Sequence, residues 1–197
     1  MRFFEQDNFH AVEWNVQSTA AILLRKRKLS DTSLIVYWCT ESLGCIQTVA
    51  RGARRARSVF AGKLDLFFAA EIQIARSRRS NLHTLTEVAL QNPFPGIRRS
   101  HLRTQTAAYF VELVELCTES DHHEPQLFSL LQRAFGYLSE KGPTRRVVLH
   151  FESELARIAG VHDTRILKSN PALALANLFG RLPASRARLL KALESSI

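Results

Sequence analysis

The chain has 197 residues, of which 46% are hydrophobic and 23% charged, values typical of a folded protein with one large or two small domains. Its 27 Lys and Arg outnumber its 18 Asp and Glu, so the net charge of +9 favours an anionic partner such as nucleic acid, a phosphate-rich ligand, an acidic peptide or a membrane surface. The three cysteines lack the regular spacing of a disulfide framework, which argues against a disulfide scaffold. The sequence shows neither a signal-peptide pattern nor a long apolar run, and we therefore expect a cytoplasmic protein with no membrane segment.

Residues 1–17 are mixed and aperiodic, and we expect them to form an N-terminal extension. Residues 18–92 contain β-branched and alternating runs separated by turn signals, with no convincing helix among them. The expected strands are residues 19–27, 32–40, 45–51, 67–76 and 82–90. Five strands predict a small closed barrel, and a five-stranded barrel that binds nucleic acid is an OB-fold.

The connection after the third strand is strongly basic, carrying five Arg and Lys and no acidic residue between positions 51 and 63. Close-set cations of this kind are usually presented to a polyanion, although a merely solvated basic loop is the alternative. The expected loops 25–30 and 76–81 are also basic, and they occupy the positions at which OB-folds hold their ligand. The predicted nucleic-acid contacts are Arg25, Lys26, Arg27, Lys28, Arg51, Arg54, Arg55, Arg57, Lys63, Arg76, Arg78 and Arg79.

Several aromatic residues of the barrel are candidates for stacking on unpaired bases. They are Tyr37, Trp38, Phe60, Phe67 and Phe68. Aromatic residues in strands usually belong to a core, so the best candidate is Phe60, which lies within the basic connection.

The run Asn92-Pro93-Phe94-Pro95-Gly96 marks a boundary, because its prolines and glycine end a strand and oppose an immediate helix. Beyond it the apolar residues recur at helical spacing. The expected helices are residues 100–117 with Ser100 as N-cap, 125–138, 145–159, 171–179, and a last helix capped by Ser185. The fold class is therefore α+β, with an OB-fold barrel over residues 18–92 followed by an all-α domain over residues 93–197.

No motif in the chain indicates catalysis or a bound metal. Cys39, Cys45 and Cys117 lack the paired spacing of a structural zinc site and are expected to be buried free thiols. We find no nucleophile with a base, no glycine loop for phosphates and no two-histidine metal motif. We therefore expect a protein that is not an enzyme and needs no cofactor.

The helical half is a candidate protein-binding domain. An acidic peptide that ends in aromatic and carboxylate groups requires an apolar pocket with a basic rim. Candidates for that rim are Arg98, Arg99, Arg103, Arg133, Arg145 and Arg146. An alternative for the whole chain is an interaction adaptor, whose basic surface binds acidic proteins and has little affinity for DNA.

Over most of residues 18–160 the chain resembles the RecO family of bacterial recombination mediators. The resemblance is carried above all by the block Val49-Ala50-Arg51-Gly52-Ala53-Arg54-Arg55 with Ser58, Phe60, Gly62 and Leu64, and also by residues 21–27, by Ser30-Asp31 with Leu34, Thr40 and Gly44, and by residues 92–96 with Tyr109, Glu112 and Leu113.

This resemblance implies an OB-fold followed by a helical domain that binds single- and double-stranded DNA and anneals complementary strands. It also implies nucleoid association, binding to the C-terminal tail of the single-strand-binding protein SSB, and cooperation with RecR to load RecA. Within the basic connection it implies DNA-backbone contacts by Arg51, Arg54, Arg55 and Arg57.

The chain departs from the family pattern at two places. Many members have a four-cysteine zinc loop after the third helix, but residues 161–171 contain no cysteine, so no zinc site is expected there. Residues 1–16 form a longer leader to the first strand than the family needs.

Overall fold

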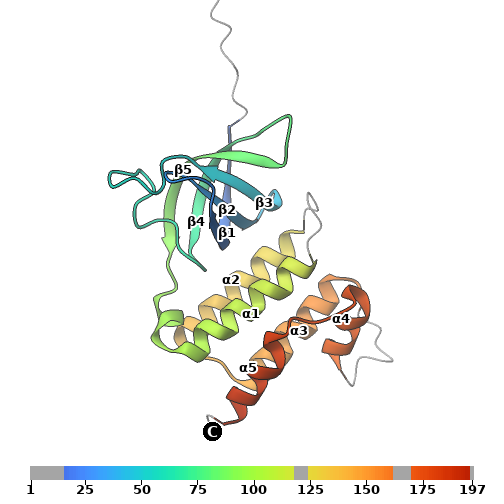
Figure 1. The fold of residues 1–197 in the computed structure, drawn as a ribbon. Coiled ribbons are helices and arrows are strands. Elements are labelled where there is room, and N and C mark those ends of the chain that lie inside the picture. Colours follow the sequence, from blue (N-terminus) through green and yellow to red (C-terminus); the bar gives the residue numbers. More distant parts are fainter. Residues whose placement is uncertain (1–15, 118–123, 162–169, 196–197) are drawn as a thin grey trace, which may run out of the picture.

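The computed structural model describes residues 16–117, 124–161 and 170–195. Its first part is a closed barrel of five strands in the order β1-β2-β3-β5-β4, in which β3 and β5 are parallel and the other pairs antiparallel (Figure 1). This arrangement confirms the predicted OB-fold. The strands are β1 (Val16–Lys28), β2 (Leu34–Thr40), β3 (Gly44–Ala50), β4 (Ala69–Ala75) and β5 (Leu82–Asn92).

The barrel interior is filled by alternate residues of its strands, as the period of two predicts. Val36 and Trp38 of β2 are fully buried there together with Ile72 and Ile74 of β4. The indole Nε1 of Trp38 donates to Thr48 Oγ1 at 2.9 Å, so the large ring is buried without leaving its polar group unpaired.

Helices make up the second part of the chain (Figure 1). Phe110 and Phe151 stack in its core with ring centroids 3.9 Å apart. Contrary to the prediction, the prolines after β5 do not exclude a helix: Pro95 starts a 3-10 helix, where its missing N–H costs nothing. The helices are η1 (Pro95–Arg99), α1 (His101–Cys117), α2 (Pro125–Glu140), α3 (Arg145–Ile158), α4 (Pro171–Phe179) and α5 (Ser185–Glu194).

The two predicted serine caps have different outcomes. Ser100 Oγ accepts the backbone N–H of Arg103 at 3.2 Å, which confirms it as the cap of α1. Ser185 is instead the first residue of α5, and its hydroxyl donates to the carboxylate of Glu112 on α1. The prediction for Ser185 is wrong because a tertiary partner takes its hydroxyl.

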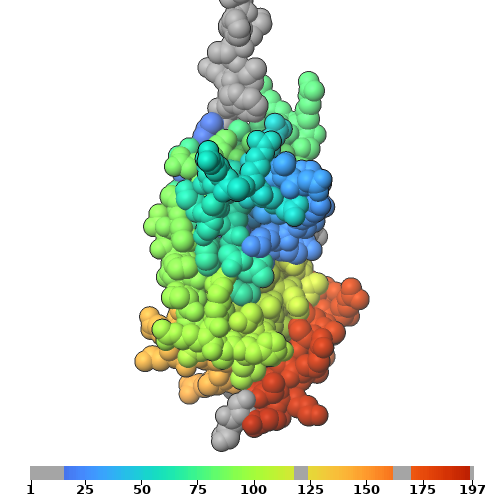
Figure 2. All heavy atoms as spheres, turned by 60° about the vertical axis from the view of Figure 1, so that its left-hand side comes forward, coloured from blue at the N-terminus to red at the C-terminus, as the bar shows by residue number. Residues whose placement is uncertain are grey.

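The barrel and the helices share a hydrophobic core. Ile22 and Cys39, on the outer face of the barrel, are buried in the same cluster as the side chains of α1 and α2. The ring of Phe135 on α2 packs edge-on against Phe67 and Phe94, at 5.4 and 5.8 Å between centroids. The space-filling view shows the barrel seated directly on the helices (Figure 2). The division at residue 92 therefore separates two architectures that are joined by continuous packing.

Candidate nucleic-acid interface

The basic loop, residues 51–64, is fixed to the barrel by its apolar side chains. Phe60 and Leu64 are buried in the barrel core, where they anchor the second half of the loop. Gly52 and Gly62 both have φ of +72°, a left-handed conformation that glycine adopts without strain. The anchored loop displays its basic side chains from a defined backbone.

Arg54 joins the basic loop to the β1–β2 loop. Its backbone N–H donates to Thr32 O at 3.0 Å, and its guanidinium Nη1 donates to Ser30 O and Asp31 O, each at 3.1 Å. Sequence reasoning treated Arg54 as a phosphate contact. In the structure its guanidinium braces two loops.

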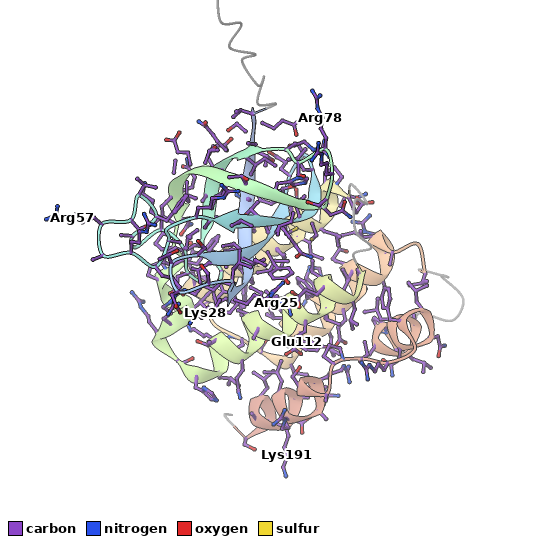
Figure 3. The ribbon with its side chains drawn as sticks, turned by 45° about the horizontal axis from the view of Figure 1, so that its top comes forward. Arg25, Lys28, Arg57, Arg78, Glu112 and Lys191 are labelled. Carbon is purple, nitrogen blue, oxygen red and sulfur yellow. The ribbon has the colours of Figure 1, made fainter. Side chains whose placement is uncertain are left out.

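The other cations of the basic loop are free to meet a ligand. Arg51, Arg55 and Arg57 are exposed, and Lys63 is half-buried. Among the described residues, none of these four forms an ion pair with a carboxylate. Figure 3 shows Arg57 extending outward from the tip of the loop. These residues form an uncompensated positive patch.

The run Arg25–Lys28 does not form a loop, contrary to the prediction, because β1 continues through it while pairing with residues 34–37 of β2. All four side chains have local partners. Arg25 lies 3.3 Å from Glu115 and over the ring of Tyr37, and Arg27 donates to the hydroxyl of that tyrosine. The others form ion pairs: Lys26 with Asp65 at 2.9 Å and Lys28 with Asp31 at 2.6 Å.

The hairpin cluster consists of Arg76, Arg78 and Arg79 in the loop between β4 and β5. All three side chains are exposed. The loop is ordered locally, with the Ser77 amide donating to His83 Nδ1 at 3.2 Å. Arg78 and Arg57 extend from different sides of the barrel (Figure 3). The predicted basic loops therefore do not converge on one place: two are joined through Arg54, and the hairpin cluster lies apart.

None of the five candidate aromatic residues presents a free ring. Phe60 is only 5% exposed and closes the barrel core, so the prediction that it stacks on bases is wrong. Trp38 and Phe67 are also buried. Tyr37 lies beneath Arg25, and Phe68 lies beneath Arg98, 4.9 Å from ring centroid to guanidinium carbon. The apolar pair Phe60 and Leu64, one helical turn apart within a polar loop, is the signal that could have indicated burial.

Three of the predicted rim arginines have partners within the described part of the fold. Arg103 Nη1 donates to Leu138 O and Ser139 O at the end of α2, at 2.9 and 2.7 Å. Arg98 Nη2 pairs with Asp65, and Arg145 pairs with Glu194. Arg103 therefore joins α1 to the end of α2, whereas the ion pairs of Arg98 and Arg145 lie at the solvent-exposed surface. Arg99 is exposed and has no ion pair among the described residues.

Arg133 and Arg146 do converge, on a pocket of about 490 Å³ between α2 and α3. Arg133 belongs to α2 and Arg146 to the first turn of α3, and both side chains are exposed. The apolar lining includes Phe110, Leu130, Ala134, Val147 and Phe151, and Tyr137 and His150 complete the rim. Sequence reasoning missed Tyr137 and His150, because which helix faces meet is a tertiary property.

Ion pairing and burial set the titration of two groups near the barrel. Burial acts to raise the pKa of Asp65, but hydrogen bonds from Lys26 and the Leu66 amide, together with the nearby Arg98, bring that pKa below its ordinary value. Burial raises the pKa of the Cys117 thiol to about 12. Asp65 is thus ionised and Cys117 protonated near neutral pH.

None of the three cysteines forms a disulfide; Cys39 is buried, and Cys45 and Cys117 are half-buried. Within the described ranges, no group of three or more His, Cys, Asp or Glu is placed to hold a metal ion. The expectation of a missing zinc loop concerns residues 161–171, most of which lie outside the described residues, as do residues 1–15. In the part of the chain that the structure covers, every helix is too short or too polar to cross a bilayer.

Comparison with known proteins agrees with this architecture. Residues 15–94 match the family model described as Recombination protein O N terminal. The DNA repair protein RecO of Rhodopirellula baltica is 34% identical over 140 residues, covering 71% of this chain and 52% of the relative. That of Syntrophus aciditrophicus is 35% identical over 133 residues, covering 68% and 51%.

The chain thus spans about half the length of the curated relatives it matches. Within the matched segment the strand order is that of an OB-fold, and the whole basic loop lies inside this segment. The chain belongs to the RecO family.

Proposed function

We propose that the chain binds single- and double-stranded DNA through exposed cations of its barrel and promotes strand annealing in recombinational DNA repair, without a catalytic step of its own. The observation that carries this is the basic loop on an OB-fold barrel. There Arg51, Arg55 and Arg57 are exposed and have no acidic partner among the residues that the structure describes. Relatives named DNA repair protein RecO support the setting.

Charge neutralisation is the physical basis of the proposal. A guanidinium matches the oxygens of a phosphate, and each neutralised phosphate releases counterions, so the affinity falls steeply with salt. Phosphate contacts carry no sequence information, which suits action on any damaged DNA. Two strands that repel one another in solution are brought together when cations on one protein offset their charge.

The helical part is proposed to bind a protein tail. The pocket between α2 and α3 offers an apolar floor at Phe110 and Phe151 and a basic rim at Arg133 and Arg146. This combination fits an acidic peptide that ends in an aromatic residue and a free carboxylate. On the basis of the resemblance to RecO, we propose that this peptide is the C-terminal tail of SSB. The same resemblance extends the proposal to RecR as a partner and to RecA as the protein loaded.

Fluorescence anisotropy with labelled single-stranded and duplex oligonucleotides, titrated across salt concentrations, tests the DNA-binding proposal. The variant Arg51→Glu/Arg55→Glu/Arg57→Glu leaves Arg54 in place, because that residue braces the loops. We expect weaker binding to every sequence and a flatter salt dependence, with unchanged thermal unfolding.

A matched control is Arg181→Glu/Arg188→Glu/Lys191→Glu, which reverses three exposed charges in the helical part. Binding that is weak and insensitive to salt in the unmodified protein would overturn the proposal. If the acidic peptide binds while DNA does not, the adaptor alternative is the correct one.

A further inference from the structure

We propose that the barrel binds two DNA strands at once, one on the basic loop and one on the hairpin cluster. This inference rests on the DNA binding proposed above and adds where each strand lies. In this arrangement the DNA does not follow one continuous track across the barrel. It binds at two separate patches, each of which has three or more cations.

The two patches are located near opposite ends of β1. The basic loop follows Ala50, whose partner Leu34 in turn pairs with Lys28 at the end of β1. The hairpin cluster follows Ala75, which pairs with Val16 at the start of β1. β1 has 13 residues, which at roughly 3.3 Å each is about 40 Å along the strand. Figure 3 shows the resulting separation of Arg57 from Arg78.

The surface between the patches offers little to hold a strand. Gln47 and Val49 of β3 pair with Leu82 and Thr84 of β5, and all four are half-buried and uncharged. On the other side, where β4 meets β5, the described charges are acidic, namely Glu71 and Glu87. A single strand that ran from one patch to the other over either of these two surfaces would therefore lack phosphate contacts along the way, whereas two strands need none there. The exposed cations at residues 25–28 of β1 lie at the end of that strand nearest the basic loop, and all four have local partners.

The bases of both strands stay available for pairing. The aromatic residues of the described barrel are buried or covered by arginines, so none of them offers a stacking platform to the bases. Holding two strands on one molecule makes their encounter intramolecular, at an effective concentration that reaches the millimolar range for short tethers. Pairing can then begin in the flexible nucleotides that extend beyond the patches.

Native mass spectrometry of the full chain with an eight-nucleotide oligothymidine counts the strands bound. Three double variants are compared with the unmodified chain: Arg55→Glu/Arg57→Glu in the basic loop, Arg78→Glu/Arg79→Glu in the hairpin cluster, and Arg181→Glu/Arg188→Glu as a charge-matched control. We expect two oligonucleotides per chain for the unmodified protein and the control, and one for each barrel variant. Annealing of complementary 30-nucleotide strands is expected to fall at least about tenfold in both barrel variants only.

One oligonucleotide per chain in the unmodified protein, weakened by both barrel variants, would show a single track and overturn the inference while leaving DNA binding intact. The same conclusion follows if only the 30-nucleotide strand binds. No binding to either length at low salt would instead overturn the proposed function itself. Should a reversal lower the melting temperature, the corresponding Arg→Gln variants provide the same comparison with a smaller charge change.

Discussion

Arg98 Nη2 lies 2.9 Å from Asp65 Oδ2, and this ion pair ties the segment after the basic loop to η1, the first turn of the helical part. The same carboxylate accepts from Lys26 Nζ of β1 at 2.9 Å. Asp65 therefore connects three segments that are distant in sequence. Because it is partly exposed, its contribution to stability is modest and screened by salt.

Asp65→Asn is expected to remove the pH-dependent contribution that the Asp65 carboxylate makes to stability. The folded pKa of Asp65 is lowered, so its stabilisation is present above the ordinary carboxyl pKa and is lost as the pH falls through the folded value. The unmodified protein should therefore melt at a higher temperature than the variant at pH 7. The difference should begin to shrink as the pH falls below about 4, and it should disappear once the pH is below the folded pKa of Asp65. A difference in melting temperature that stayed constant down to pH 3 would contradict the ionic role.

Gly96→Ala should destabilise the junction between η1 and α2. A Cβ built at Gly96 would lie 1.8 Å from Ser139 O, so backbone would have to move, at a cost of at least about 2 kcal/mol. Gly136→Ala is the matched control, because nothing lies within 4 Å of its Cβ and alanine favours the helix by about 1 kcal/mol. Urea unfolding measures the change in the free energy of unfolding, which should be negative for Gly96→Ala and positive for Gly136→Ala. Equal changes in the two variants would contradict the close approach of Gly96 to Ser139 O.

Glu152→Ala should be among the most damaging single changes. This fully buried carboxylate accepts from the Tyr109 hydroxyl at 2.5 Å and from Arg186 Nε and Nη2 at 2.7 and 3.0 Å. Removing it leaves the guanidinium on α5 without its partner and costs about 3 kcal/mol or more. Tyr109→Phe retains the ion pair and should cost about 1 kcal/mol. Chemical denaturation measures the loss of stability in each variant. A larger loss in Tyr109→Phe than in Glu152→Ala would contradict the expected order.

Arg54→Ala and Arg55→Ala separate bracing from ligand binding within the basic loop. The first should cost about 1 kcal/mol and speed hydrogen exchange at residues 29–33, because it removes the contacts of Arg54 to Ser30 O and Asp31 O. Arg55→Ala should leave the stability and the hydrogen exchange at residues 29–33 unchanged and should weaken DNA binding. If exchange were equally fast in both variants, the bracing role would be refuted.

Arg133→Glu/Arg146→Glu should reduce binding of a synthetic acidic peptide ending in phenylalanine at least about tenfold, because both charges border the pocket that receives it. Arg145→Glu is the control, since Arg145 neighbours Arg146 in sequence but pairs with Glu194 instead. Isothermal titration calorimetry measures the affinity of each variant for the peptide. Equal losses in the two variants would indicate a general charge effect with no defined pocket.

Several errors of sequence reasoning have a common physical origin. Arg25 to Lys28 resemble a loop because they are polar, yet backbone pairing with β2 keeps them extended. Phe60 lies among arginines in the sequence but is buried in the barrel core. Backbone hydrogen bonding and burial depend on residues far along the chain, so local composition does not determine them.

What the sequence by itself determined is the order of the elements: the period of two in the strands, the change to helical spacing after residue 92, and the accumulation of positive charge in the first half. These follow from local periodicity and composition. Only the tertiary structure decided which cations remain free, since Arg54, Arg98 and Arg103 are occupied by carbonyls and carboxylates of other segments. It also decided that Arg133 and Arg146 meet across one pocket, because the packing of α2 against α3 brings residues from two helices to one place.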